Sequence, residues 1–406
     1  MHDAEIVSGG LMMIEDLSEV IAEVSSQMVK LRRQIHQMPE PAYEEHETAA
    51  AIVEKLRSVK NIEIEEGVGK TGVVAHICRS KPGPCIALRA DMDCLRMQEK
   101  NTVPHVSKKE GLMHGCGHDG HIACLVGAAI VLGRVPDKLH GPVKFIFQPA
   151  EENYAGAEQM ILSGALTNPV PRAIFGLHGT PSLPLGKIGS RKGPMMAASR
   201  YFSITVSGKG THAAMPHKGV DTVLAASQIV CAAHTIVSRN INPFESALIS
   251  IPKFNGSSAP NVIPAEVHLE GTLRALSNST RNFLEKRLTD VVVQTAQAYG
   301  AEASIVFDKG YPLLENSEEC YDYLMETGRM IVGRENTVTD YPPSLGAEDF
   351  SFYLQKVPGA FWWLGLGIDA ATDAPLHNPL FDFNDDVISR AISMHCQLVL
   401  NADRLS

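Results

Sequence analysis

Apolar residues near the N-terminus recur every three or four positions, which is the spacing of a helix with one buried face. This spacing predicts a helix from Met12 to about Gln37, ending at the Met38-Pro39-Glu40-Pro41 run because proline cannot continue a helix. Further helices are predicted at about Glu45 to Ser58 and Gly120 to Gly133. The apolar positions that define the first helix are Ile14, Leu17, Ile21, Val24, Met28, Leu31 and Ile35.

Short, mostly apolar runs lie between these helices and predict strands that are buried on both faces. Because such strands alternate with helices, we expect an α/β domain with a central, mostly parallel sheet between helices. After Met195 the pattern changes to the order β-α-β-β-α-β, which is that of a ferredoxin-like α+β unit. The first strands are predicted at Thr71–Ile77, Cys85–Leu88, Val143–Phe147 and Ala173–Leu177.

The ferredoxin-like pattern ends near Gly310-Tyr311-Pro312, and the chain then returns to the earlier type with a helix at Glu318 to Val332 and a strand at Phe361 to Leu366. We therefore expect a small domain inserted into a large one, with hinges at this segment and at Gly193-Pro194. The predicted parts are a catalytic domain over residues 1–195 and 310–406, and an inserted dimerisation or lid domain over 196–309.

Composition excludes several classes of protein. The chain has 406 residues, 44% hydrophobic and 20% charged, which is globular and long enough for two domains. The net charge of −10 argues against nucleic acid as a partner. Eight cysteines without a C-x-x-C pair indicate reduced thiols, and the segment Met1–Ile14 lacks the basic and apolar regions of a leader. No apolar run approaches ~20 residues, so we expect a cytoplasmic protein without membrane contact.

Common catalytic motifs are absent. Gly67 to Gly72 resembles a phosphate-binding loop, but position 64, where the first glycine would stand, is Ile64. Neither a G-x-S-x-G elbow nor an H-E-x-x-H helix occurs. These absences argue against a P-loop nucleotide-binding protein, a serine hydrolase with this elbow and a zincin.

What remains is a set of potential metal ligands. The segment Met113 to His121 holds three histidines, Cys116 and Asp119 just before an apolar helix, and the glycines beside Cys116 allow it to point at the same place as His118. Asp119 could cap the helix or hold the second nitrogen of a ligand histidine.

Further candidates follow predicted strands, where open α/β sheets place their ligands. Glu151-Glu152 follows one strand and His178 another, while His377 lies in the proline-bounded loop Pro375 to Pro379. A set of cysteine, glutamate and histidine suits two divalent transition metals and disfavours magnesium or calcium. Adjacent glutamates point in different directions, so one can bind metal while the other faces a reacting water.

Several segments together resemble the aminoacylase and carboxypeptidase family of dinuclear metallopeptidases, with the nearest likeness to the amidohydrolases of hippurate, indole-acetyl amino acids and N-acetyl-diaminopimelate. They span residues 32 to 381, so the resemblance covers nearly the whole chain. They are Arg32 to Glu40, Leu88 to Asp93, Met113 to Asp119, Gln148 to Glu152, Gly208 to Pro216, Asn261 to Pro264, Gly271 to Arg274 and Gly346 to Phe350.

The resemblance implies a role for each matching residue. Glu151 corresponds to the general base, and His212 to a histidine that reaches the active site of a partner subunit, which implies a homodimer. Asn261 and Arg274 correspond to residues that hold the carboxylate of the substrate. The implied ligands of two divalent ions (zinc or manganese, alternatively cobalt or nickel) are Cys116, His118, Glu152, His178 and His377, with Cys116 bridging.

The resemblance implies hydrolysis of N-acyl-L-amino acids, hippurate-like or with other acetyl or aryl-acyl groups, to a carboxylate and a free amino acid. A dipeptidase or carboxypeptidase with the same dinuclear site is the alternative, and a non-catalytic binding module with this fold is a third. The chain departs from the family at Arg96, where a proline is usual, and at Asn153 to Gly156, which is often glycine-rich. These departures leave the substrate preference open.

Overall fold

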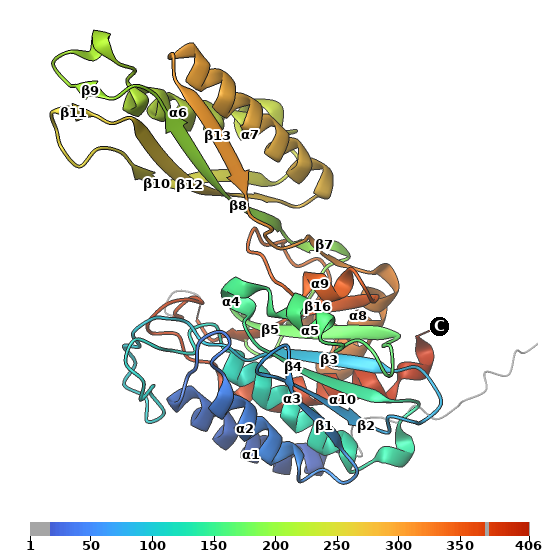
Figure 1. The fold of residues 1–406 in the computed structure, drawn as a ribbon. Helices are drawn as coiled ribbons and strands as arrows, with labels where there is room; N and C mark the ends of the chain where they lie inside the picture. The colour runs from blue at the N-terminus through green and yellow to red at the C-terminus, as the bar shows by residue number, and fades with distance from the viewer. Residues whose placement is uncertain (1–16, 370–372, 406) are drawn as a thin grey trace, which may run out of the picture. The chain divides into compact units, whose positions relative to one another are not determined.

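The computed structural model describes residues 17–369 and 373–405, and in these ranges the chain forms two compact units (Figure 1). The first unit comprises the described parts of Met1–Gly193, Asn316–Tyr341 and Tyr353–Ser406, and the second comprises Pro194–Glu315 and Pro342–Phe352. Every helix in these ranges is too short or too polar to cross a lipid bilayer.

The first unit is built on a mixed sheet of eight strands in the order β1-β2-β4-β3-β5-β16-β6-β15. Its four central strands are parallel, and antiparallel pairs join β1 to β2, β2 to β4, and β6 to β16. Every residue of β3 and β4 is buried, so both faces of the sheet are covered, which confirms the predicted α/β architecture. The strands are β1 Glu63–Val68, β2 Gly72–Ile77, β3 Ile86–Asp91, β4 Val143–Gln148, β5 Ala173–Pro184, β6 Ile188–Gly189, β15 Thr337–Val338 and β16 Gly359–Gly367.

Helix α3 is the centre of the helical layer, because it packs against β3 and β5 as well as against α1 and α10. Its surface is apolar all round, as expected for a helix enclosed by protein. Gly127 allows the close approach of α10, since a Cβ there would lie 2.4 Å from a methyl of Ile392. The helices are α1 Ser18–Gln37, α2 His46–Leu56, α3 His118–Gly133, α4 Glu151–Tyr154, α5 Gly156–Leu162, α8 Glu318–Val332, α9 Ser351–Leu354 and α10 Ile388–Leu400.

Several predicted elements differ in their bounds from the structure; the strand predicted at Cys85–Leu88, for example, is observed at Ile86–Asp91. The helix expected from Met12 is observed from Ser18, and residues 12–16 lie outside the described ranges. The strand expected to end at Leu177 was too short: β5 continues to Pro184 because it keeps pairing with β16, where His178 lies opposite Trp363. His178 therefore lies within a strand and not after one.

The second unit has the ferredoxin-like fold that the sequence predicts. Its four-stranded antiparallel sheet has the order β10-β12-β8-β13, and α6 and α7 cover a separate apolar core. Asp221 and Ser277 accept hydrogen bonds from backbone N–H groups in the first turns of α6 and α7, so both helices begin at a side-chain cap. The elements are β8 Ala198–Ser207, α6 Thr222–Asn240, β10 Ala247–Asn255, β12 Glu266–Ala275, α7 Asn278–Ala298 and β13 Glu302–Phe307.

Two short pairs of strands complete the unit. Strand β9, Thr211–His212, pairs with β11, Val262–Ile263. Strand β7, Gly193–Met196, pairs with β14, Leu314–Asn316, where the chain enters and leaves this unit. The two segments that connect Pro194–Glu315 to the first unit are therefore hydrogen-bonded neighbours, while Pro342–Phe352 joins the second unit from a later part of the chain.

Candidate metal centre

The turn before α3 places two candidate ligands at one point. Gly117 has a φ of 86°, in the left-handed region that glycine adopts without strain. A Cβ at this position would lie 3.1 Å from the ring of Phe383, so the turn is also closely packed. Cys116 and His118, on either side of Gly117, contribute ligand atoms that lie within 4.8 Å of one another and of His178.

Four side chains converge around the Cys116 thiol. Its Sγ lies 3.3 Å from Nε2 of His178 and 3.3 Å from Nε2 of His377. Glu152 closes the group, with Oε1 3.4 Å from Nε2 of His377 and 3.9 Å from Nε2 of His118. The structure thus brings together all five residues that the sequence proposed as metal ligands.

Two of these groups lack the hydrogen bonds that buried polar atoms ordinarily make. Nε2 of His118 and Oε1 of Glu152 are buried, and neither has a hydrogen-bond partner. A buried polar atom without a partner is destabilising, and a divalent cation would satisfy both atoms. Thiol, imidazole and carboxylate together are donors suited to a transition metal, so the residues fit the expected ions.

The electrostatics of the site also favour a cation. Burial raises the pKa of the Cys116 thiol well above its usual value, and the carboxylate of Glu152 raises it further. Burial alone would lower the pKa of His118, but the carboxylates of Asp91 and Asp93 outweigh burial and raise this pKa to about 10. Both shifts show that the site disfavours more negative charge and stabilises positive charge.

Backbone carbonyls orient two of the histidines. Nδ1 of His118 lies 2.8 Å from the carbonyl oxygen of Asp93, and Nδ1 of His178 lies 2.7 Å from that of Gly179. A carbonyl can only accept, so each Nδ1 carries the proton and donates it. In the neutral ring, Nε2 then carries a lone pair. This atom faces Cys116 in His178 and Glu152 in His118.

Asp93 holds the two adjacent glutamates. The backbone N–H of Glu151 donates to its Oδ1 at 3.0 Å, and that of Glu152 donates to its Oδ2 at 3.1 Å. Ala150, which precedes them, has a φ of 56°, and its N–H donates to Glu45 at 3.0 Å. Sequence analysis did not assign Asp93 a role, although its place just after β3 was a usable signal.

Other residues of the predicted ligand cluster have structural contacts. Nδ1 of His121 lies 2.6 Å from Asp91, and its Nε2 accepts the N–H of Gly179 at 2.9 Å. Asp119 was expected to cap α3 or hold a ligand histidine. Instead it forms an ion pair with Arg32, whose Nε lies 2.7 Å from its Oδ2.

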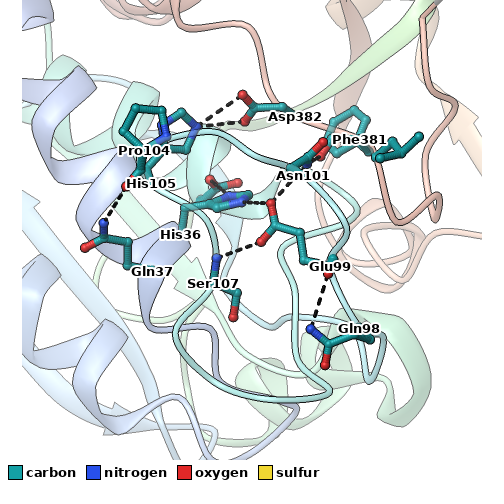
Figure 2. A network of polar contacts seen from close by, with 12 residues as sticks. His36, Gln37, Gln98, Glu99, Asn101, Pro104, His105, Ser107, Phe381 and Asp382 are labelled. Atoms are coloured by element: carbon teal, nitrogen blue, oxygen red, sulfur yellow. Dashed lines mark hydrogen bonds and ion pairs between the residues drawn. The ribbon is translucent and has the colours of Figure 1, made fainter.

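This ion pair belongs to a buried polar network that includes His36 and Glu99 (Figure 2 shows the contact between these two). His36 lies 2.8 Å from Asp119 through Nδ1 and 3.2 Å from Glu99 through Nε2. Burial opposes protonation of His36, but Asp119 outweighs burial and raises the pKa of His36 to about 9. Arg32 also pairs with Asp382 on the C-terminal loop.

The same network fixes the loop that carries His377. Asn101 donates to the carbonyl oxygen of Phe381 at 2.8 Å, and the N–H of Lys100 donates to that of Pro379 at 2.9 Å (Figure 2 shows the first of these). His377 itself has a φ of 61°, and its side chain is 54% exposed. The position of the exposed His377 therefore depends on the hydrogen bonds that Pro379 and Phe381 accept.

The remaining site residues of the sequence analysis lie in the second unit, at two separate places. His212 and Asn261 are neighbours, since Val262 pairs with His212 and the carbonyl of Asn261 accepts the N–H of Ala213 at 3.0 Å. Arg274 lies near the other end of β12, with its guanidinium over the ring of Tyr201. The stretch from Glu266 to Arg274 spans roughly 26 Å at ~3.3 Å per residue.

Comparison with known proteins identifies the family of this chain. The family model for peptidase family M20/M25/M40 matches residues 87–401. The chain belongs to this family. Membership confirms the resemblance found in the sequence and identifies the chain as a metal-dependent amidohydrolase.

Individual relatives differ in the activities that their names state. The N-acetyl-L-cysteine deacetylase of Bacillus subtilis is 40% identical over 91% of this chain and 87% of its own length. Thermostable carboxypeptidase 2 of Saccharolobus solfataricus is 37% identical over 96% of this chain and 98% of its own length. A crystal structure of a dinuclear metal binding peptidase of the M20 family from Bacillus subtilis superposes with a TM-score of 0.83 and 32% identity, covering 95% of this chain and all of the other.

We expect the Arg32→Met substitution to lower the free energy of unfolding by about 3–5 kcal/mol, because the buried Asp119 carboxylate loses its guanidinium partner and keeps only His36 beside it. The neighbouring Arg33→Met is the matched control. Arg33 is half exposed and pairs with Asp385, so its loss should cost less than ~1 kcal/mol. Urea unfolding of both variants at the same metal content measures the difference, and equal losses would contradict a stabilising role for the buried network.

Proposed function

We propose that this protein hydrolyses the amide bond of N-acyl-L-amino acids, releasing a carboxylate and a free amino acid. The observation that carries the proposal is the position of Glu151. Its carboxylate is buried and lies within 4.8 Å of the ligand atoms of His118 and Glu152, two of the five candidate ligands. A carboxylate beside such a centre is placed to act on a water molecule that attacks an amide.

The candidate ligands fall into two groups that share one atom. Cys116, His118 and His178 form one group, and Cys116, Glu152 and His377 form the other. This overlap supports a pair of divalent ions, which these five residues would hold with Cys116 common to both groups. Such ions, when bound, would lower the pKa of water from about 16 towards about 7 and polarise an amide carbonyl. Zinc and manganese are the metals proposed, with cobalt and nickel as alternatives.

Glu151 would act first as a base and then as an acid. It accepts a proton from the attacking water and later delivers it to the nitrogen of the leaving amine. Asp93, which binds the backbone N–H groups of Glu151 and Glu152, keeps this carboxylate next to the ligand set. His212 would donate a hydrogen bond to the carbonyl oxygen as negative charge develops there, a contact whose loss typically costs about 3 kcal/mol.

Binding of the substrate's carboxylate is assigned to Arg274 and Asn261. A guanidinium binds a carboxylate through two hydrogen bonds, which selects an N-acyl amino acid over a plain amide. The carboxylate and the scissile carbonyl of an amino acid are only about one residue repeat apart, ~3.8 Å. Because roughly 26 Å of β12 lies between Arg274 and the His212–Asn261 pair, one copy of the unit cannot present both to one substrate. A second copy, as in a homodimer, can.

A carboxypeptidase or dipeptidase is the second candidate, favoured by the 37% identity to a carboxypeptidase of S. solfataricus. Such a peptidase would use the same metal ligands and the same Glu151. The two candidate functions therefore differ only in the group on the acyl side of the cleaved amide bond. A non-catalytic binding module is disfavoured because Glu151 and all five candidate ligands are present together.

We expect the chain to lose hydrolysis after treatment with a chelator and to regain it with zinc, manganese, cobalt or nickel but not with magnesium, whose preferred ligands are oxygens. The reloaded protein should hydrolyse N-acetyl and N-benzoyl amino acids faster than dipeptides, measured as release of the free amino acid. Faster cleavage of dipeptides would support the peptidase instead.

Glu151→Gln should lower kcat at least ~100-fold, since a positioned general base contributes 10²–10⁴-fold. Metal content, measured by mass spectrometry, should stay at the wild-type value because Glu151 is not one of the proposed ligands. Glu54→Gln, at an exposed position of α2, is the matched control and should retain full activity. If Glu151→Gln kept its turnover with full metal, Glu151 would not be the base.

Mixed dimers test the shared site. The variants His212→Ala and Glu151→Gln should each be nearly inactive, but a mixed dimer would contain one site with both residues intact. An equimolar mixture should therefore recover about a quarter of wild-type activity, since half of the dimers are mixed and each has one intact site of two. Absence of recovery in dimers shown to be mixed would argue that His212 acts within its own chain.

A further inference from the structure

A cavity of about 420 Å³ adjoins the candidate metal centre. Asp93, Glu152 and His377 are part of its lining, and all of its lining residues belong to the first unit. Its volume falls within the range of small-molecule sites. Because it reaches the proposed ligands, whatever fills it lies next to the reacting bond.

The charges of the lining suit an uncharged group. Its carboxylates are those of Glu44, Asp93 and Glu152, and its one guanidinium, that of Arg96, is already paired with Glu44 at 3.1 Å. Apart from the proposed metal ligands, the lining therefore offers a substrate carboxylate no unpaired cationic side chain. On the proposed function, Arg274 and Asn261 of the second unit take the carboxylate, so this cavity is left for the acyl group.

One wall of the cavity carries an aromatic ring close to the reaction centre. Tyr154 is 64% exposed although it is only two residues from Glu152. Its ring packs at 6.0 Å on Tyr43, whose hydroxyl donates to the carbonyl oxygen of Tyr154 at 3.4 Å. The ammonium of Lys70 lies 3.7 Å above the ring of Tyr43. These contacts hold the ring of Tyr154 while leaving much of its surface open.

Further lining comes from flexible apolar side chains. Leu95 and Met97 both line the cavity and both lie over Gly115, where a Cβ would be 2.5 Å from the terminal methyl of Met97. Gly115 precedes Cys116 and accepts the N–H of His377 at 2.9 Å, so Met97 rests on backbone that belongs to the centre itself. A methionine beside an aromatic group adapts its shape and makes favourable sulfur–ring contacts.

We propose that this cavity is the acyl-group subsite and that it selects planar aromatic acyl groups over acetyl, with Tyr154 and Met97 as the residues that determine the selection. An acetyl group would fill only a small part of a cavity of about 420 Å³ and leave most of its waters in place. An aryl group displaces more of them, stacks with Tyr154 and contacts Met97. This inference rests on the proposed function and names its substrate class.

The test compares kcat/KM for N-benzoyl, N-acetyl and N-succinyl derivatives of one amino acid with the metal-loaded protein. The wild type should prefer N-benzoyl. Tyr154→Ala should lower kcat/KM for N-benzoyl about 10-fold while changing that for N-acetyl less than ~2-fold. Tyr154→Phe keeps the ring and should keep the preference for N-benzoyl over N-acetyl. Met97→Ala should reduce this preference, as Tyr154→Ala does. Tyr299→Ala, an exposed tyrosine of the second unit, is the matched control.

Each outcome separates this inference from the function on which it rests. Equal losses for N-benzoyl and N-acetyl in Tyr154→Ala would overturn the aromatic subsite and leave the amidohydrolase intact. A preference for N-succinyl that disappears in Arg96→Ala would show instead that the cavity takes a carboxylate. If the wild type hydrolysed dipeptides and none of the three N-acyl derivatives, the proposed function and this inference would both fail.

Discussion

The thiol of Cys116 belongs to two groups of candidate ligands at once, and the rest of the site is arranged around that shared atom. A buried thiolate beside carboxylates is unfavourable unless positive charge compensates it. This constraint explains why the surrounding backbone is held so tightly. Asp93 binds the backbone of both glutamates, and carbonyl oxygens fix the rings of His118 and His178.

Behind these contacts, the Arg32–Asp119–His36 network joins segments that are far apart in the sequence. It connects α1, the first turn of α3 and the loop around Asp382. The start of α3 carries His118, and the loop carries His377. The relative position of these two ligand candidates is therefore coupled to a set of charged residues that are not themselves candidate ligands.

Sequence alone could predict much of this because local signals were strong. The buried strands, the ferredoxin-like order and the glycines around Cys116 all follow from residues close together in the chain. The polar network could not be predicted, since Arg32 and Asp382 are neighbours only after folding. Asp93 was missed for a related reason: its role depends on two backbone N–H groups some 60 residues away. The full length of β5 depends on its pairing with β16, which no pattern within β5 reveals.

The pairing of β7 with β14 has a consequence for how such a molecule can arise and vary. The points where the segment Pro194–Glu315 leaves and re-enters the first unit are hydrogen-bonded neighbours, so this segment adds little strain to the scaffold that hosts it. That segment also has its own apolar core and capped helices. The ferredoxin-like unit is thus a module that can be lengthened, remodelled or exchanged during evolution while the ligand-bearing scaffold stays the same.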